Sequence, residues 1–160
     1  MSSLLMTGFP GFLGSALLPK VLARREGVQA VCLVQPQHLE LARERVAEIE
    51  TAHPHVVGRV VLIEGDITVP GLGVDVTHRP LLADVTEVWH LAAVYDLSVP
   101  EAIARRVNVE GTGHIIEFCQ SRAQFDRLQY VSTCYVSGDF EGTFTEDDLD
   151  LGQGFLNHYE

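Results

Sequence analysis

Short apolar runs alternate along the chain with longer segments in which apolar residues recur at helical spacing. Helical spacing marks residues 13–21, 39–49 and 103–119. The apolar runs have the length of ordinary strands and lie at about residues 4–7, 29–34, 59–64, 86–91 and 127–132. Because strands and helices alternate, the pattern predicts repeated strand–helix–strand units and a parallel sheet with helices on its faces.

Two of these runs, residues 60–63 and 87–91, are almost continuously apolar. Parallel strands that helices cover on both faces have this character. We therefore expect both runs to be central strands rather than edges of the sheet.

A glycine-rich turn follows the first predicted strand and opens the first predicted helix. It reads Thr7-Gly8-Phe9-Pro10-Gly11-Phe12-Leu13-Gly14, with its glycines three residues apart. Without a Cβ, Gly8 and Gly11 permit a tight turn whose N–H groups approach a pyrophosphate, and Gly14 allows the helix to pack closely on the sheet. In this context the turn predicts a dinucleotide site at a helix N-terminus, and a turn that binds no ligand is the alternative.

The end of the second predicted strand bears on which dinucleotide binds. An acidic residue there binds the ribose diol of NAD, whereas an arginine favours the 2′-phosphate of NADP. Gln35 occupies this position, and Arg43 and Arg45 follow only in the next helix. The missing acid favours NADP(H) over NAD(H), and the missing arginine keeps that preference small.

Other candidate contacts follow the third and fourth predicted strands, because an open parallel sheet binds ligands at the carboxyl ends of its strands. Asp66 can accept a hydrogen bond from an adenine amino group, and it can equally be a turn-forming aspartate. Ala92 and Ala93 leave room for a flat cofactor, and they can equally be tightly packed core residues.

A hydroxyl and a tyrosine late in the chain are candidates for catalysis. The fifth predicted strand leads into Ser132 and Thr133, and Tyr159 is the penultimate residue. Such a pair can donate hydrogen bonds to a carbonyl oxygen and polarise it. Taken singly, a threonine is more often a helix cap and a tyrosine more often lies at the edge of the core.

Six motifs in this order make the chain resemble the extended short-chain dehydrogenase/reductase superfamily. They are Thr7-Gly8-x-x-Gly11-Phe12-Leu13-Gly14, Gly65-Asp66-Ile67, His90-Leu91-Ala92-Ala93, Asn108-Val109-Glu110-Gly111-Thr112, Val131-Ser132-Thr133-x-x-Val136-x-Gly138 and Asn157-His158-Tyr159. Within it, Val94-Tyr95-Asp96 and residues 155–160 look most like the NAD-binding domains of male-sterility-type fatty acyl-CoA reductases and thioester reductases. The resemblance implies an α/β fold with a Rossmann-like, doubly wound parallel sheet across residues 1–160.

The resemblance also implies roles for individual residues. Thr133 would be the catalytic Ser/Thr, Tyr159 would give its proton to the substrate carbonyl, and Asn108 would support the active-site hydrogen bonds. For Asn108 the alternative is an asparagine that only accommodates a local distortion of its helix. The implied cofactor-binding residues are Thr7, Gly8, Phe9, Pro10, Gly11, Phe12, Leu13, Gly14, Gln35, Asp66, Ile67, Leu91, Ala92, Ala93 and Val131.

One departure from the family concerns the tyrosine. In the family, a lysine four residues after it lowers the pKa of its hydroxyl and binds the nicotinamide ribose. Here the chain ends at Glu160, and its only lysine is Lys20. Because a tyrosine without a nearby cation keeps a pKa of about 10, it is a poor acid–base catalyst at neutral pH. We therefore expect this chain to be the N-terminal, cofactor-binding part of a longer enzyme, with the C-terminal strands and the substrate lobe missing.

Three functions stay open. The first is an NAD(P)H-dependent reductase of an acyl thioester on CoA or a carrier protein, which forms an aldehyde or alcohol. The second is an epimerase, dehydratase or ketone reductase that acts on a nucleotide sugar or a small ketone. The third is a dinucleotide-binding module without catalysis.

Composition and charge narrow the partners and the compartment. A formal net charge of −11 disfavours nucleic acid. No apolar stretch reaches the roughly 18 residues of a membrane span. Three widely spaced cysteines predict reduced thiols in a cytoplasmic protein. A homodimer is left open, and no metal is expected, because His53 and His55 have no third ligand in view.

The only shift in composition is at residues 139–150, which are acidic and contain a glycine. This pattern predicts a solvated surface loop, and a flap beside a substrate cleft is the alternative.

Overall fold

Five parallel strands form one sheet in the computed structural model, which describes residues 2–157 and 159–160. Their order across the sheet is β3-β2-β1-β4-β5, and all neighbours run parallel. The strands are β1 (Ser3–Thr7), β2 (Gln29–Val34), β3 (Val60–Glu64), β4 (Val85–His90) and β5 (Arg127–Tyr130). Each predicted strand is confirmed to within about two residues, the ordinary uncertainty of strand ends.

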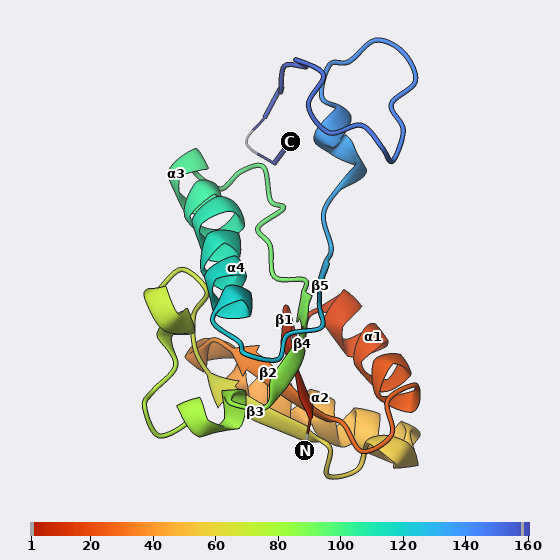
Figure 1. Cartoon of the computed structure of the whole chain (residues 1–160), viewed down its shortest axis with the longest axis vertical. Coiled ribbons are helices and arrows are strands. Elements are labelled where there is room, and N and C mark those ends of the chain that lie inside the picture. Colours follow the sequence, from red (N-terminus) through yellow and green to blue (C-terminus); the bar gives the residue numbers. More distant parts are fainter. Residues whose placement is uncertain (1, 158) are drawn as a thin grey trace.

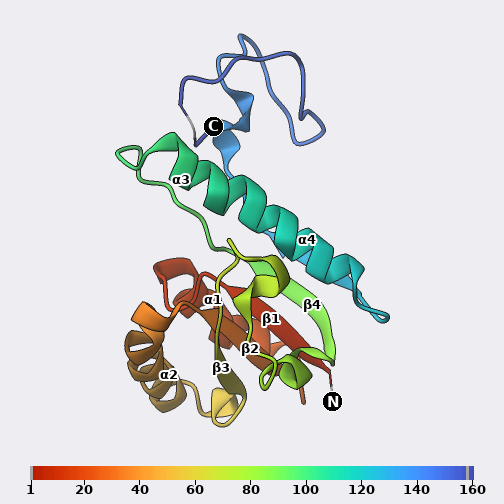
Figure 2. The same ribbon diagram turned by 90° about the vertical axis from the view of Figure 1, so that its left-hand side faces the viewer.

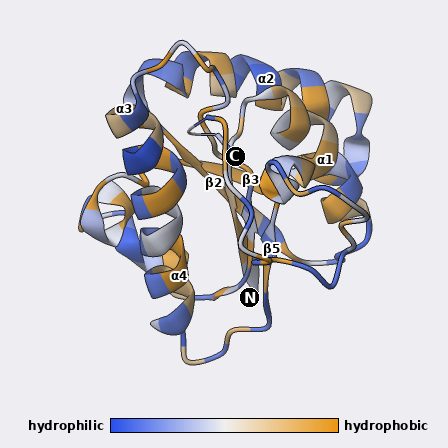
Figure 3. Cartoon of the chain, turned by 90° about the horizontal axis from the view of Figure 1, so that it is seen from above, coloured by the Kyte–Doolittle hydropathy of each residue, from blue (hydrophilic) through white to orange (hydrophobic). Residues whose placement is uncertain are grey.

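Helices cover both faces of the sheet, as Figures 2 and 3 show. One face carries α1 (Phe12–Ala23) and α2 (Leu39–Ala52), and the other carries α3 (Glu101–Arg105) and α4 (Thr112–Gln120). A π-helical segment, Arg106–Gly111, joins α3 to α4 within the predicted helix. Short 3₁₀ helices occur at Pro36–His38, Pro54–Val56, Pro70–Gly73, Arg79–Leu82 and Cys134–Ser137. The Rossmann-like α/β fold is therefore confirmed.

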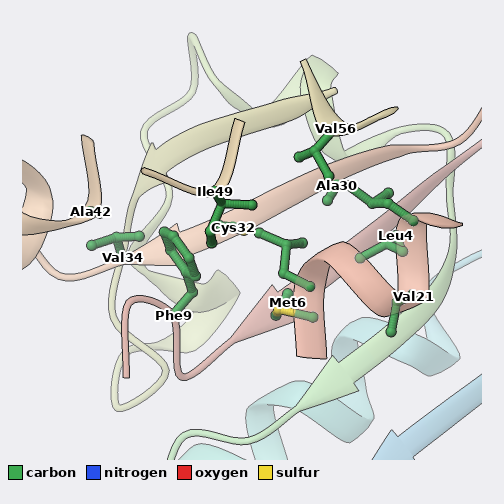
Figure 4. Close-up of a cluster of buried hydrophobic side chains, with 12 residues drawn as sticks. Leu4, Met6, Phe9, Val21, Ala30, Cys32, Val34, Ala42, Ile49 and Val56 are labelled. Atoms are coloured by element: carbon green, nitrogen blue, oxygen red, sulfur yellow. The ribbon is translucent and has the colours of Figure 1, made fainter. Parts of the chain in front are cut away.

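The buried core is divided by the sheet into two clusters. Leu4 and Met6 of β1 pack with Cys32 and with residues of α1 and α2 (Figure 4). Leu5, between them, points to the opposite face and packs with a cluster that includes Ile115 of α4. Because both faces are covered, all five residues of β1 are buried.

The prediction of two central strands is half right. β4 lies between β1 and β5, whereas β3 is an edge of the described sheet, so the prediction for residues 60–63 is wrong. The apolar run has another cause, because Leu62 packs on one face of the sheet and Ile63 on the other. Burial of both faces makes a strand apolar even where one of its edges has no neighbouring strand.

The segment after β5 differs from the rest of the fold. It extends beyond the ends of the strands, in blue in Figure 1. After the 3₁₀ helix at Cys134–Ser137, its described residues form no further helix or strand. Local hydrogen bonds shape it, such as those from the backbone N–H and the hydroxyl of Thr145 to Asp148, both 2.8 Å. Its acidic part is mostly exposed, which agrees with a solvated loop.

None of the helices in the described part of the chain combines the length and the apolar character that crossing a membrane requires.

Candidate functional site

A cavity of about 700 Å³ opens where the strands end. Its walls are the glycine-rich turn after β1, the end of β2, the turn after β3, the loop after β4 and part of the segment after β5. Every predicted cofactor-binding residue except Gly14 lines it. Of the three predicted catalytic residues, Tyr159 lines the cavity, while Thr133 and Asn108 are not among its described lining residues.

The glycines of the turn are required by contacts within the protein itself. Gly8 has a φ of +80°, and a Cβ there would lie 2.8 Å from the backbone carbon of Leu91. A Cβ on Gly11 or Gly14 would lie 2.7 or 2.8 Å from the carbonyl oxygen of Gly8. The prediction for Gly14 is therefore corrected, because the closest contacts at that position are with the turn rather than with the sheet.

The N-terminus of α1 faces this turn without a side-chain cap. Gly11 is the N-cap, and no side chain hydrogen-bonds to the first turn there. The backbone N–H of Gly11 donates to Gly8 O at 3.0 Å, which closes the turn. Uncapped N–H groups at a helix N-terminus attract anions. The turn and the uncapped helix N-terminus therefore offer the donors and the space that a pyrophosphate needs.

Gln35 and Asp66 meet at the ends of β2 and β3. Gln35 Nε2 donates to Asp66 Oδ2 at 3.2 Å, and Thr68 N donates to Asp66 Oδ1 at 2.8 Å. Burial pushes the pKa of Asp66 up, but these bonds and the charge of Arg106 outweigh it, so the pKa lies below its usual value. Asp66 is therefore an ionised acceptor that lines the cavity and also forms the turn expected of a turn-forming aspartate.

The loop after β4 is held against the glycine-rich turn. The backbone N–H groups of Leu91 and Ala92 both donate to Thr7 Oγ1, at 3.2 Å. Ala92 also packs against the second core cluster, so it serves as core as well as cavity wall, whereas Ala93 is exposed. Both alanines leave space in the cavity, as the small side chains predict.

Asn108 lies in the π-helical segment and binds the loop after β4. Its Oδ1 accepts from Val94 N and its Nδ2 donates to Val94 O, both at 2.8 Å. Isolated π-helical turns often mark functional sites. The local distortion considered as an alternative for Asn108 is present, and the side chain also fixes Val94, which lines the cavity.

Thr133 and Tyr159 occupy different positions relative to the cavity. Thr133 is the N-cap of the 3₁₀ helix at Cys134–Ser137, and its Oγ1 accepts from Tyr135 N at 3.2 Å. Tyr159 lines the cavity together with Val131 and Ser132. His158, in the same motif as Tyr159, lies outside the described residues.

Several lining residues were not predicted from the sequence. They are spread over β2, the segments that follow β2, β3, β4 and β5, and the π-helical segment, and they are Leu33, His38, Leu41, Gly65, Thr68, Val94, Tyr95, Val107 and Ser132. For Gly65 and Thr68 a signal existed, because they flank Asp66 and Ile67 in one turn. His38 has no such signal in its spacing.

Lys20, His53 and His55 are not among the described residues that line the cavity. Lys20 is exposed in the last turn of α1, at the other end of that helix from Gly11. The rings of His53 and His55 have their centroids 5.8 Å apart. No group of three or more metal-ligating side chains is found among the described residues.

An NAD-binding family model described as "Male sterility protein" matches residues 6–160. This span contains the glycine-rich turn and all three predicted catalytic residues. The chain belongs to the male sterility protein family. Membership confirms the resemblance to the NAD-binding region of extended short-chain reductases and the prediction that the cofactor is a nicotinamide dinucleotide. The preference for NADP(H) stays a prediction.

Curated relatives of this male sterility family chain include proteins that are several times longer than it. The non-canonical nonribosomal peptide synthetase cpsA of Aspergillus campestris is 33% identical over 140 residues, covering 83% of this chain and 13% of that protein. A putative fatty acyl-CoA reductase of Drosophila melanogaster is 28% identical over 144 residues, covering 82% of this chain and 28% of that protein. The chain thus spans less than a third of the length of either relative.

Solved structures share the fold of this male sterility family chain. The terminal R domain of the myxalamid PKS-NRPS biosynthetic pathway matches with a TM-score of 0.80 and 26% identity, over 99% of this chain and 42% of that one. The UDP-glucuronic acid 4-epimerase of Bacillus cereus, solved with UDP-glucuronic acid and NAD, matches with a TM-score of 0.68 and 26% identity, over 98% of this chain and 47% of that one.

Proposed function

We propose that the chain is the dinucleotide-binding part of a longer reductase that reduces acyl thioesters on CoA or a carrier protein to an aldehyde or alcohol. The observation that carries this proposal is the single cavity in which the glycine-rich turn, the loop after β4 and Tyr159 meet. A dinucleotide site and a hydroxyl donor thereby share one space. The likeness to a fatty acyl-CoA reductase and to the myxalamid R domain supports the thioester as substrate class.

The parts of the cavity would hold different parts of the cofactor. The turn and the uncapped N-terminus of α1 would bind the pyrophosphate. Asp66 and Ile67 would flank the adenine, and Gln35 would lie near the adenosine ribose. Ala92 and Ala93 would leave space for the nicotinamide half of the molecule.

The chemistry would be divided between the cofactor and the hydroxyl groups of the protein. When bound, the reduced nicotinamide supplies the hydride. Tyr159 would give its proton to the carbonyl oxygen of the thioester as the hydride adds to the carbonyl carbon. Breaking of the C–S bond would then leave the aldehyde and release the thiol of CoA or of the carrier protein, with the proton passing from the oxygen to the sulfur. A second hydride and a second proton would give the alcohol.

The family resemblance implies that Thr133 donates to the same carbonyl oxygen and stabilises the developing negative charge. Its Oγ1 accepts from Tyr135 N, so its hydrogen is free to donate, although Thr133 is not among the described lining residues.

Tyr159 needs a cation beside it to act at neutral pH. Lys20 lies on α1, away from the cavity lining. In the proposed longer protein, a lysine four residues after Tyr159 would lower the pKa of its hydroxyl, as the family resemblance implies.

The test is an assay of the full-length protein with NADPH and either a long-chain acyl-CoA or an acyl group on a carrier protein. Oxidation of NADPH, together with an aldehyde or alcohol identified by mass spectrometry, is the expected result. Failure to turn over either thioester would contradict the proposal. If the protein still binds NADPH, a dinucleotide-binding module and an enzyme that acts on a nucleotide sugar are the remaining functions.

A second candidate is an enzyme that acts on a nucleotide sugar. It is favoured by the likeness to the UDP-glucuronic acid 4-epimerase, which extends over 98% of this chain. Incubation of the same protein with UDP-glucuronic acid distinguishes the two, because an epimerised sugar without thioester reduction would replace the first proposal.

We further propose that the cofactor is NADP(H) rather than NAD(H). Gln35 stands where NAD-binding proteins have an acid, and both ends of its amide are engaged, by Asp66 and by Gln37. Titration of the full-length protein with NADPH and NADH measures the preference. Gln35→Asp should weaken binding of NADPH by about tenfold, because a carboxylate repels the 2′-phosphate, and an equal loss for NADH would contradict this assignment.

A further inference from the structure

Three neighbouring strands end on side chains that touch one another. Thr7 of β1 is paired in register with His90 of β4, and His90 with Tyr130 of β5. Thr7 and His90 are buried, with 1% and 0% of their surface exposed. Thr7 Oγ1 lies 2.7 Å from His90 Nδ1, and the rings of His90 and Tyr130 are stacked with centroids 5.4 Å apart. His90 is therefore fixed in both position and ring plane.

The direction of the bond between Thr7 and His90 follows from the other partners of Thr7. Its Oγ1 accepts from the backbone N–H groups of Leu91 and Ala92. A hydroxyl has one hydrogen and two acceptor sites. Since both acceptor sites are used, the hydrogen of Thr7 is donated to Nδ1 of His90, and that nitrogen carries no proton.

The other ring nitrogen of His90 faces the start of α4. His90 Nε2 lies 3.1 Å from Thr112 Oγ1, and the Thr112 hydroxyl donates to Asn108 O at 2.7 Å. Because Thr112 has given its hydrogen to Asn108, its oxygen accepts from His90. Nε2 therefore carries the proton. The bond from Thr7 to Nδ1 requires this same tautomer of His90.

A neutral ring is the state that burial favours. Burial lowers the pKa of His90 from 6.5 to about 4. At neutral pH one ring nitrogen is a donor and the other an acceptor, so both hydrogen bonds form at once. A doubly protonated ring would instead face Thr7 with an N–H where an acceptor is needed.

The hydrogen bonds of His90 join two parts of the proposed dinucleotide site. On one side, Thr7 holds the loop after β4 and directly precedes Gly8 of the glycine-rich turn. On the other side, Thr112 bonds to Asn108, whose side chain grips Val94 in the same loop. The loop that carries Ala92 is thus connected to the imidazole of His90 by two hydrogen-bonded routes, one through Thr7 and one through Thr112 and Asn108.

We propose that His90 is a positioning residue that, as its Nε2–H tautomer, clamps the loop after β4 between the glycine-rich turn and the π-helical segment and thereby sets the affinity for the dinucleotide. This inference rests on the proposed dinucleotide site. His90 acts through Thr7 and Thr112, and it is not one of the residues that line the cavity.

The first test compares two substitutions at Thr112 in the full-length protein. Thr112→Val keeps the shape of the side chain but removes the acceptor for His90 Nε2–H and the donor to Asn108 O, whereas Thr112→Ser keeps a hydroxyl for both bonds. Calorimetric titration with NADPH should show about three- to tenfold weaker binding for the valine variant, since one buried donor loses its partner. The serine variant should bind within about twofold of the wild type, and equal affinities for both variants would overturn the proposal.

A double-substitution cycle asks whether Thr112 acts through His90. In a His90→Phe background both bonds of His90 are already lost and only the bond from the Thr112 hydroxyl to Asn108 O remains, so Thr112→Val should weaken the binding of NADPH much less than it does in the wild-type background. A further loss equal to that in the wild-type background would show that the two residues act independently and would contradict the proposal.

The tautomer of His90 can be measured in the wild-type protein, without a binding experiment. The ¹⁵N chemical shifts of the imidazole, assigned by comparison with His90→Gln, should show a protonated Nε2 and an unprotonated Nδ1 at neutral pH. A protonated Nδ1 would overturn the inference even if His90→Phe fails to fold. If the wild type binds no NADPH, the proposed function fails, while the tautomer still decides whether the clamp exists.

Discussion

The part of the chain up to β4 and the segment after β5 are built on different principles. In the first part, all five residues of β1 are buried and Gly8 is pressed against Leu91. In the second, the described residues are mostly half-buried or exposed and are shaped by local turns. The predicted cofactor contacts lie mainly in the first part, whereas Thr133 and Tyr159 lie in the second.

Because of this difference, substitutions in the two parts should affect the free energy of unfolding and the proposed activity differently. A change in the first part disturbs the core and the dinucleotide site together, because the same backbone serves both. A change in the segment after β5 should alter chemistry with little effect on unfolding, because few buried contacts depend on it. Four substitutions or conditions can break or sharpen this contrast.

The largest effect is expected for Tyr159→Phe, which removes the proposed proton donor and no core contact. In the full-length protein, the rate of NADPH oxidation with an acyl thioester should fall by about 10²- to 10⁴-fold, with an unchanged melting temperature. Tyr135→Phe is the matched control, because its side chain is exposed and is not among the described lining residues. Equal losses in the two variants would remove Tyr159 from the mechanism.

The next largest effect concerns pH and His90. Because its pKa is about 4 in the folded protein and near 6.5 in the unfolded chain, only the unfolded chain binds a proton between these values. The free energy of unfolding should therefore decrease as pH falls from about 6.5 to 4, by about 3 kcal/mol in total. Urea unfolding at several pH values measures this slope.

His90→Phe provides the control for that slope. The variant lacks the buried imidazole, so its free energy of unfolding should change less over the same pH range. The carboxylate of Asp66, whose pKa lies below its usual value, contributes at lower pH and should be common to both proteins. An unchanged slope in the variant would contradict the assignment to His90.

A smaller effect is expected for Gly8→Ala. The alanine would have to adopt a φ of +80°, and its Cβ would lie 2.8 Å from the backbone carbon of Leu91. Strain and overpacking together should lower the free energy of unfolding by about 2–3 kcal/mol and should also weaken dinucleotide binding. Urea unfolding and NADPH titration check the two parts of this result.

The smallest effect is expected for Gly152→Ala, the counterpart of Gly8→Ala in the segment after β5. Gly152 has a φ of +81°, but a Cβ there would meet nothing within 4 Å. Only the backbone strain remains, so the cost should be about 1 kcal/mol or less, with dinucleotide binding unchanged. A loss as large as that at Gly8 would show that the segment is an integral part of the folded core.

Much of the fold could be predicted because strand-length apolar runs and helical periodicity are local signals. The position of β3 at the edge was missed, since burial of both faces gives the same apolar run as a central position. The π-helical segment around Asn108 was also missed, because one extra residue per turn barely disturbs a periodicity judged over residues 103–119. The contact between Asn108 and Val94 depends on that segment and has no signal of its own.

The candidate site could be predicted where it lies in a motif. Gly8, Asp66 and Ala92 stand directly after strands, so strand order alone brings them to one edge of the sheet. His38 ends a short 3₁₀ helix and Tyr95 lies in an irregular loop, and both were missed as lining residues because the paths of these segments depend on tertiary contacts. Thr133 was expected at the cavity, but its described contact is the cap of a short helix.

The carbonyl oxygen of Gly8 has a consequence for the evolution of such proteins. It would collide with a side chain at Gly11 or at Gly14 whether or not a dinucleotide is bound. Selection for folding alone is therefore enough to retain these glycines. A descendant protein that no longer binds a dinucleotide would still keep these glycines. The motif by itself therefore indicates the backbone conformation of the turn and not that a ligand is bound. Residues without a packing role, such as Gln35, would drift first and would be the better record of continued use.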